Sequence, residues 1–275
     1  ARHFYNKDET LLAMNGDILS EMDLSAMIKL HKSSNALATV ALHPVDDPTR
    51  FGVVRLNEHS RIREFLEKPK LADAPSRLIN AGVYLLERQV IDRIPDGRKV
   101  VIEREVFPDL ANEGRLFGYV HSGTWFDIGD ISDFRNANFE LLTSRASDKV
   151  VLETGANASA SAKLTCPTLV GNRAVVEDGA NLGPLAIIGR RAHIHRDARV
   201  AGSIVFDDAE IGSGATIEDA VIGNGVTIGR RVEIQHGSVI AGLARIHDNV
   251  RITHDVYVHP YKEIDQDILS PGHVV

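Results

Sequence analysis

The first strong hydrophobic pattern is an apolar run at positions 11–14, which passes into the polar turn Asn15-Gly16-Asp17. An apolar run bounded by turn residues is typical of a buried strand in a parallel sheet. Ligands of open α/β sheets bind beyond the carboxyl ends of the strands, so Asp17 is a candidate for holding a substrate or a metal ion. Asn-Gly is also the commonest hairpin turn. We favour the strand end, because residues 18–21 do not alternate and residues 23–32 follow a helical pattern.

The pattern that follows, up to about residue 143, mixes the periods of strands and helices. Apolar or alternating runs predict strands, and amphipathic stretches that begin at Asp or Ser predict helices. The predicted strands cover residues 38–45, 51–56, 61–67, 78–86 and 116–120. The predicted helices cover residues 23–32, 88–93, 103–111 and about 130–143. This mixture indicates a layered α/β domain.

The second half carries an internal repeat in which aliphatic residues recur every six positions, with one shortened step before Val205. The repeated positions are Val170, Val176, Leu182, Ile188, Ile194, Val200, Val205, Ile211, Ile217, Ile222, Ile228, Ile234, Ile240, Ile246 and Ile252. A small or β-branched residue stands two positions before most of them. The pattern resembles the left-handed parallel β-helix, in which three hexapeptides make one triangular coil. It predicts four to five coils, with a weaker lead-in from about Ala158 and a cap at residues 256–262.

Composition changes between the two halves. Fourteen of the 22 glycines lie after residue 150, whereas most aromatic residues lie before it. A chain of 275 residues is also long enough for two domains. We therefore expect an α/β domain over residues 1–148 and a β-helix with its cap over residues 149–275.

Charge and cysteine content narrow the classes of partner. A net charge of −7 gives no basic surface for nucleic acid or an anionic membrane. Cys166 is the only cysteine, so no disulfide forms within the chain. The sequence has no apolar stretch of about 18 residues and no pattern of a signal peptide. These features predict a cytoplasmic protein.

Four local clusters in the first half carry groups suited to chemistry. They are Asp17, the pair Glu67-Lys68 before Pro69, the strand segment Asn80-Ala81-Gly82, and Asp127 between bulky apolar neighbours. Each has an ordinary structural explanation. An acid–base pair is usually solvated, an aspartate before a helix is usually a cap, and a strand glycine usually marks a bulge. No single cluster predicts a function.

Six motifs in one order do predict a family. The segments NGD, FGVV, FLEKP, INAGVYLL, EREVFPDL and WFDIGDISDF lie between Leu11 and Leu142. Together they resemble the sugar-phosphate nucleotidyltransferases, and most closely the mannose-1-phosphate guanylyltransferases. Enzymes that act on glucose 1-phosphate are nearly as similar. The resemblance implies a Rossmann-like nucleotidyltransferase fold before the β-helix.

The resemblance also implies a reaction and its metal. An oxygen of a hexose 1-phosphate attacks the α-phosphate of a nucleoside triphosphate, and pyrophosphate leaves. Asp17 and Asp127 match the two aspartates that hold the catalytic Mg²⁺. Two carboxylates suit Mg²⁺, which completes its coordination with phosphate oxygens and water. Positioning and charge neutralisation then supply most of the catalysis.

Five further residues match the part of the family's site that holds the sugar phosphate. Lys68 matches the lysine that contacts the phosphate, which adds it to the two aspartates as a catalytic residue. Glu67 matches the acid that binds sugar hydroxyls. Asn80 and Gly82 match the strand segment that lines the sugar pocket. Gly52 matches a glycine that lets the ligand approach the backbone.

One part of the family pattern is missing from the sequence. The glycine-rich segment that cradles the triphosphate normally precedes the NGD strand, along with the parts that read the base. Here the residues before Asp17 contain no glycine other than Gly16. We expect an N-terminally incomplete domain, with a fragment of a longer enzyme as the favoured explanation. The alternatives are a non-catalytic assembly or regulatory subunit, and a site completed by another chain.

The repeat leaves a third functional class open. Hexapeptide helices also occur in acetyltransferases, which use a histidine as a general base. In this chain His236 would be the candidate for that role. Other histidines of the repeat are His193, His195, His247 and His254, and we expect all five to be ordinary surface residues of the coils. No long loop interrupts the repeat to form an acceptor pocket. We expect the β-helix to build a homo-oligomer instead.

Overall fold

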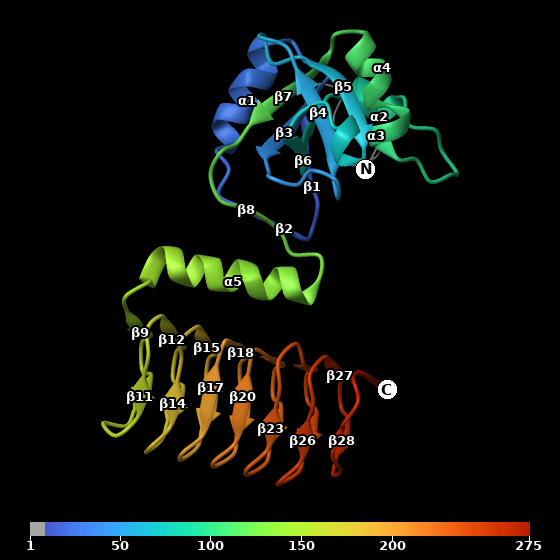
Figure 1. The fold of residues 1–275 in the computed structure, drawn as a ribbon. Coiled ribbons are helices and arrows are strands. Elements are labelled where there is room, and N and C mark those ends of the chain that lie inside the picture. The colour runs from blue at the N-terminus through green and yellow to red at the C-terminus, as the bar shows by residue number, and fades with distance from the viewer. Residues whose placement is uncertain (1–8) are drawn as a thin grey trace. The chain divides into compact units, whose positions relative to one another are not determined.

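The computed structural model describes residues 9–275, and the chain forms two compact units (Figure 1). The first unit ends at Gly129 and the second begins at Asp130. The sequence pattern predicted this boundary at 148/149. The difference is the helix α5 (Ile131–Ala146), which groups with the repeat and not with the α/β unit.

The first unit is built on a six-stranded sheet with the order β5-β4-β6-β3-β7, in which β1 also pairs with β6. Its strands are β1 (Leu11–Met14), β3 (Ala38–Pro44), β4 (Gly52–Leu56), β5 (Ile62–Glu67), β6 (Leu78–Leu86) and β7 (Leu116–Val120). Strands β3 and β7 run parallel, and the other pairs are antiparallel. The predicted strands are therefore present, in a mixed sheet.

Helices cover both faces of this sheet (Figure 1). They are α1 (Leu24–Ser33), α2 (Arg88–Asp92), α3 (Ile102–Glu105) and α4 (Phe107–Asn112), with a 3₁₀ turn at Leu71–Asp73. Met27 of α1 packs with Ala81, Val83 and Leu85 of β6. On the opposite face, Phe107 and Leu110 of α4 belong to a second apolar cluster. This layering confirms the predicted α/β class.

The predicted helix over residues 103–111 is divided into α3 and α4. Val106 lies between them with φ −120° and ψ −47°, and Pro108 occupies the first turn of α4. Proline has no N–H to donate and crowds the preceding turn, so it favours a helix start over a helix interior. Pro108 therefore begins a new helix at Phe107.

The opening strand β1 differs from its prediction. It pairs antiparallel with β6, matching Leu11 with Leu86 and Met14 with Val83. It is half-exposed rather than buried, since Leu12 is 41% and Met14 is 52% exposed. Among the described residues it has a strand partner on one side only, so the prediction of a buried parallel strand was wrong.

The hairpin alternative for Asn15-Gly16 is also excluded. The strand after this turn, β2 (Ile18–Ser20), pairs with β8 (Trp125–Asp127) and not with β1. Asp17 therefore stands at the end of one strand and at the entry to a separate two-stranded ribbon.

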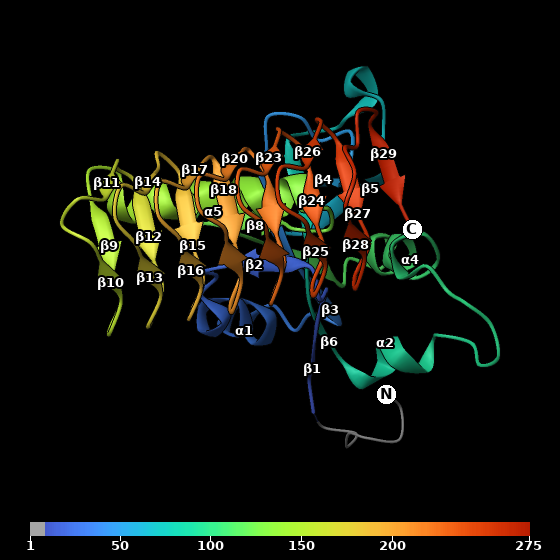
Figure 2. The same cartoon turned by 90° about the horizontal axis from the view of Figure 1, so that it is seen from below.

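The second unit is a three-sided parallel β-helix, and α5 belongs to it. One side contains β10 (Asn157–Ala158), β13 (Val175–Val176), β16 (His193–Ile194), β19 (Glu210–Ile211), β22 (Thr227–Ile228), β25 (Arg245–Ile246) and β28 (Glu263–Ile264). The second contains β11 (Lys163–Leu164), β14 (Asn181–Leu182), β17 (Arg199–Ala201), β20 (Thr216–Glu218), β23 (Glu233–Ile234) and β26 (Arg251–Ile252). The third contains β9 (Val150–Leu152), β12 (Thr168–Val170), β15 (Ala186–Ile188), β18 (Ser203–Val205), β21 (Val221–Ile222), β24 (Val239–Ile240), β27 (Val256–Val258) and β29 (Gly272–Val274). Figure 2 shows the coils following one another from β9 to β29.

The interior of the β-helix confirms the hexapeptide prediction. Ile188, Ile194 and Ile217 are fully buried, and small residues such as Ala180 and Ala198 lie with them in the same core. Aliphatic side chains thus stack from coil to coil, and this burial is the main force that stabilises the unit. Figure 1 shows α5 running along the sheet that contains β12, β15 and β18, and its Phe134 stacks on Phe206.

The β-helix is longer than the four to five coils predicted, because one side alone has seven strands. The coils before Val170 were predicted only as a weak lead-in from about Ala158, because small residues at their inward positions, Ala156, Ala158 and Ala162, weaken the aliphatic period. The predicted cap at 256–262 was also misplaced. Val256–Val258 forms β27, which pairs with β24 and with β29. In the part of the chain that the structure covers, no helix is long and apolar enough to cross a bilayer.

Candidate active site

Three of the predicted sugar-site residues form one row across neighbouring strands of the first unit. Glu67 at the end of β5 is the register partner of Gly52 at the start of β4. On the other side of β4, Val53 pairs with Ile79 of β6, and this antiparallel register sets Gly52 beside Asn80. Residues directly opposite one another share a face of the sheet. A carboxylate and an amide therefore flank a position that has no side chain.

The row depends on Gly52 remaining a glycine. A Cβ atom at this position would lie 2.9 Å from Glu67 Oε2 and 2.9 Å from the Phe65 ring. Any larger residue would displace the carboxylate that the row presents. A strand glycine at such a place often marks the close approach of a ligand or another backbone.

Asn80 is held in place by a chain of hydrogen bonds. Its Nδ2 donates to the Tyr84 hydroxyl at 2.9 Å, and that hydroxyl donates to Glu103 Oε1 at 3.1 Å. Its Oδ1 accepts from the Gly82 N–H at 3.1 Å. Burial, helped by the charge of Glu103, raises the pKa of Tyr84, so the hydroxyl stays protonated and remains a donor. The amide is thereby fixed before any ligand arrives.

Gly82 connects this row to the turn that carries Asp17. Its φ is +73°, which disfavours other residues, and a Cβ there would lie 2.8 Å from Asn15 Nδ2 and 3.1 Å from Ile18 Cγ1. The Asn15 N–H donates to the Gly82 carbonyl at 2.8 Å. The turn at residues 15–17 is therefore attached directly to the strand that carries Asn80.

The two predicted metal ligands come together at the short ribbon. Ile18 of β2 is paired with Asp127 of β8, and the Ile128 N–H donates to the Asp17 carbonyl at 2.8 Å. A Cβ atom built on Gly129 would lie 3.1 Å from Asp127 Oδ1 and 3.5 Å from Asp17 Oδ2. Both carboxylates thus face the same small space next to Gly129, although 110 residues separate them.

The donor atoms in this space fit a hard divalent cation. Both groups are carboxylate oxygens, the ligand type that Mg²⁺ prefers, and Asp17 is exposed while Asp127 is half-buried. Two carboxylates leave coordination positions for water and phosphate oxygens. The Gly129 N–H donates to Asp127 Oδ1 at 3.1 Å and orients that carboxylate.

Trp125 links the strand segment 80–82 to the strand that carries Asp127, a role that the sequence did not predict. Its indole N–H donates to the Ala81 carbonyl at 3.0 Å, between Asn80 and Gly82. Its ring stacks on His43 at 5.4 Å and meets Phe51 edge-on at 5.6 Å. Its position two residues before Asp127 was the available signal. Asn15 and Tyr84 were missed as well, because their contacts exist only in the folded sheet.

Lys68 lies at the margin of the row. It directly follows Glu67, is exposed, and adopts φ +50° while its N–H donates to the Phe51 carbonyl at 3.0 Å. This bend ends the strand and leaves the ammonium group free to reach a ligand. The structure thus gathers Gly52, Glu67 and Asn80 in one row, joins Asp17 to Asp127, and connects the two through Gly82. The roles of all seven residues remain predictions.

Comparison with known proteins defines the class. Residues 1–144 match the family described as nucleotidyl transferase, and residues 164–274 match the GMPPB C-terminal domain. The chain belongs to the nucleotidyl transferase family.

Individual relatives narrow the resemblance. A mannose-1-phosphate guanylyltransferase of Mycobacterium tuberculosis is 37% identical over 73% of this chain and 53% of its own length. A probable mannose-1-phosphate guanylyltransferase 2 of Oryza sativa is 32% identical over 96% of this chain and 71% of its own length. A UTP–glucose-1-phosphate uridylyltransferase of Synechocystis is 30% identical over 73% of this chain and 55% of its length. The chain thus spans about half the length of the first of these relatives.

Proposed function

We propose that the protein forms a nucleotide sugar from a hexose 1-phosphate and a nucleoside triphosphate, with release of pyrophosphate. One observation carries the proposal. Asp17 and Asp127, far apart in sequence, face one space beside Gly129, and the turn that holds Asp17 is bonded to the Asn80–Gly82 strand. Membership of the nucleotidyl transferase family supports the same chemistry.

The residues of the site divide the work by their chemistry. Glu67 Oε1 and Oε2 accept hydrogen bonds from sugar hydroxyls, and Asn80 adds an amide held by Tyr84. Gly52 leaves room for the sugar ring between them. The Lys68 ammonium pairs with the sugar phosphate. Positioning of the phosphate oxygen for in-line attack on the α-phosphate is the main contribution of these groups.

Asp17 and Asp127 are the residues that would hold Mg²⁺, because their oxygens are of the type it prefers and they meet at one place. When bound, the ion neutralises the charge that develops on the phosphate oxygens. The side chains of Lys68 and of the row then need only bind and orient the sugar phosphate.

Mannose 1-phosphate with GTP is the first substrate pair that we propose. The relatives named as mannose-1-phosphate guanylyltransferases and the match to the GMPPB C-terminal domain support this choice. Glucose 1-phosphate is the second candidate sugar, supported by the uridylyltransferase of Synechocystis. We further propose that the protein is cytoplasmic. We also propose that it forms a homo-oligomer through the β-helix, which light scattering on the purified protein would test.

The test is pyrophosphate release by the purified protein. Mannose 1-phosphate and glucose 1-phosphate are each paired with GTP, UTP, ATP and dTTP in the presence of Mg²⁺. We expect turnover to be fastest with mannose 1-phosphate and GTP. Asp127→Asn is expected to lower kcat/KM at least about a hundredfold, because one of the two carboxylates that would hold Mg²⁺ is lost.

Asp73→Asn is the matched control, since Asp73 is an exposed aspartate of the same unit. It is expected to leave turnover unchanged. Absence of pyrophosphate release with every pair, together with retained sugar-phosphate binding, would instead identify a non-catalytic assembly or regulatory subunit and refute the proposal.

A further inference from the structure

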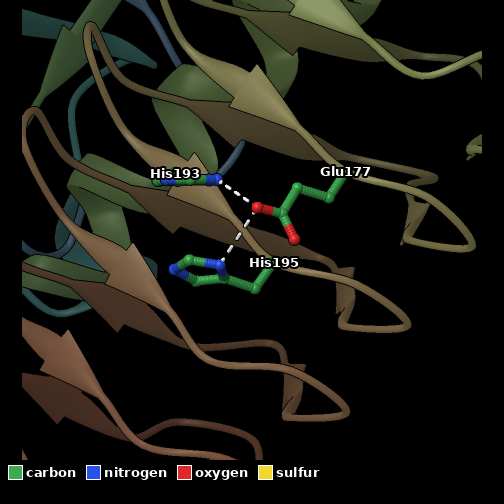
Figure 3. Close-up of side chains that lie close together, drawn as sticks. All are labelled: Glu177, His193 and His195. Atoms are coloured by element: carbon green, nitrogen blue, oxygen red, sulfur yellow. Dashed lines mark hydrogen bonds and ion pairs between the residues drawn. The ribbon is translucent and has the colours of Figure 1, made fainter.

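Three metal-ligating side chains meet on the outside of the β-helix, in a unit that the proposed transferase site does not use. They are Glu177, His193 and His195, and Figure 3 shows both imidazoles directed at one carboxylate. Glu177 Oε1 lies 2.7 Å from His193 Nε2 and 3.3 Å from His195 Nδ1. The three ligand atoms all lie within 4.8 Å of one another.

The coil geometry places these residues together. His193 lies in β16 and His195 directly follows that strand, so the two point the same way while Ile194 between them is fully buried. The neighbouring coil pairs Val175 with His193 and Val176 with Ile194, which brings Glu177 opposite His195. The cluster thus bridges two successive coils.

The side chains are held in position without any ion. Glu177 Oε2 accepts from the Arg196 N–H at 3.0 Å, which turns Oε1 toward the histidines. The two imidazole rings stack with centroids 4.0 Å apart and 24° between their planes. Each of the three side chains is about one-third exposed, so solvent and ions reach them.

Other histidines of the β-helix lie in pairs or in a more exposed group. His247 Nε2 lies 2.6 Å from Glu263 Oε1, which is a pair and not a triad. His236, His254 and Asp255 do form a second group, but Asp255 and His236 are exposed, and Asp255 directly follows His254 in the chain. Glu177, His193 and His195 are all partly buried, and the Arg196 N–H fixes the Glu177 carboxylate.

We propose that Glu177, His193 and His195 bind a divalent transition metal ion, with Zn²⁺ the favoured ion. Two imidazoles and one carboxylate are a donor set that zinc takes in proteins. Around a tetrahedral ion with bonds of about 2.0 Å, ligand atoms are about 3.3 Å apart. The His195 contact already has that length, and the His193 contact lengthens by a small movement of exposed side chains. Mg²⁺ does not suit the site, because it prefers oxygen ligands.

Three protein ligands leave one coordination position for water. Because Glu177 and the two histidines come from successive coils, the ion would join these coils. It would remain accessible from solvent, since all three side chains are partly exposed. This site is independent of the proposed transferase chemistry, because its residues lie in the second unit and the transferase residues lie in the first.

The test is a Zn²⁺ titration of the purified full chain by calorimetry, with excess Mg²⁺ present to occupy the carboxylate pair at Asp17 and Asp127. We expect one equivalent of Zn²⁺ that is lost in the double variant His193→Asn, His195→Asn. Removal of an outer-shell partner already weakens metal sites about tenfold or more, so loss of the ligand in Glu177→Gln should weaken binding by at least that factor. Co²⁺ in place of Zn²⁺ should show visible absorption bands that the double variant lacks.

The matched control is His247→Asn, which disrupts a histidine–glutamate pair of the same kind without a third ligand. It should keep the full Zn²⁺ equivalent. Thermal melts establish that each variant is folded, which we expect because the altered side chains face outward. Equal Zn²⁺ binding by the wild type and the folded double variant would overturn the proposal.

Discussion

At the residue scale, the proposed site depends on positions where a side chain is missing. Gly52, Gly82 and Gly129 each leave space beside a functional oxygen or amide: Glu67 Oε2, Asn15 Nδ2 and Asp127 Oδ1. In each case a Cβ would lie about 3 Å or less from that atom. The motifs of the sequence pointed to Gly52 and Gly82. The role of Gly129 appears only when Asp17 and Asp127 are brought together.

Gly82→Ala tests this dependence on glycine. The variant combines a left-handed backbone at φ +73° with a clash against Asn15, and we expect it to lose about 2–3 kcal/mol of unfolding free energy. Binding of the sugar 1-phosphate should weaken as well, because the turn that carries Asp17 is displaced. Urea denaturation and calorimetric titration measure the two effects.

Gly97→Ala is the control for this variant. Gly97 also has a positive φ, +77°, but open space surrounds the position of its Cβ. We expect a loss of about 1 kcal/mol from backbone strain alone, with unchanged sugar-phosphate binding. Equal losses of stability in the two variants would show that the contact with Asn15 has no energetic importance.

At the element scale, helix α5 illustrates how one capping residue fixes a boundary. Asp130 accepts at Oδ1 from the Asp133 N–H at 2.8 Å and from the Ser132 hydroxyl at 2.7 Å. These hydrogen bonds lower the pKa of Asp130, with the backbone bond contributing most. The sequence predicted a helix start at about residue 130, and the structure confirms it with Asp130 as the N-cap.

The lowered pKa of Asp130 predicts a dependence of stability on pH. Because the folded state binds the proton more weakly than the unfolded state, the stabilisation is present above about pH 4 and is lost as the pH falls through the folded pKa. Asp130→Ala should cost about 1 kcal/mol at pH 7, and the difference from wild type should shrink in acid. Asp130→Asn keeps an acceptor and should cost less. Urea unfolding at a series of pH values measures these differences.

Glu140→Ala is the control, since Glu140 is an exposed acid in the same helix. Its effect should stay within about 0.5 kcal/mol at every pH. A loss in Asp130→Ala that does not change with pH would show that the charge of the cap is irrelevant.

At the scale of the whole molecule, the chain contains separate apolar cores. Leu110 is fully buried in a cluster that includes β3, β6 and α4, and Ile217 is fully buried in the stack of coils. Each unit therefore has its own source of hydrophobic stabilisation. Such an arrangement is typical of domains that unfold in separate transitions.

Calorimetry of the full chain tests this independence. Leu110→Ala and Ile217→Ala each leave a cavity, which costs about 2–5 kcal/mol. We expect each variant to lower the midpoint of a different transition by about 5 °C or more. Leu243→Ala, at an exposed position of the β-helix, should move neither. A single transition that both core variants lower equally would contradict independent units.

The sequence by itself determined whatever depends on local periodicity and residue type. The hexapeptide repeat resembled that of a β-helix, and the structure confirms it: the aliphatic residues at every sixth position are buried together with small residues such as Ala180. Strands 78–86 and 116–120 were predicted at their observed bounds from their apolar or alternating runs. The resemblance carried by six motifs added the family and the seven candidate residues.

Only the tertiary structure decided what depends on pairing between distant segments. The antiparallel pairing of β1 with β6, the ribbon that joins Asp17 to Asp127, and the contact of Trp125 with Ala81 have no local signature. The first coils gave only a weak lead-in in the sequence, because alanine at their inward positions carries little hydrophobic signal. His193 and His195 were expected to be ordinary surface residues. Their meeting with Glu177 arises from the register between coils, which sequence spacing alone does not reveal.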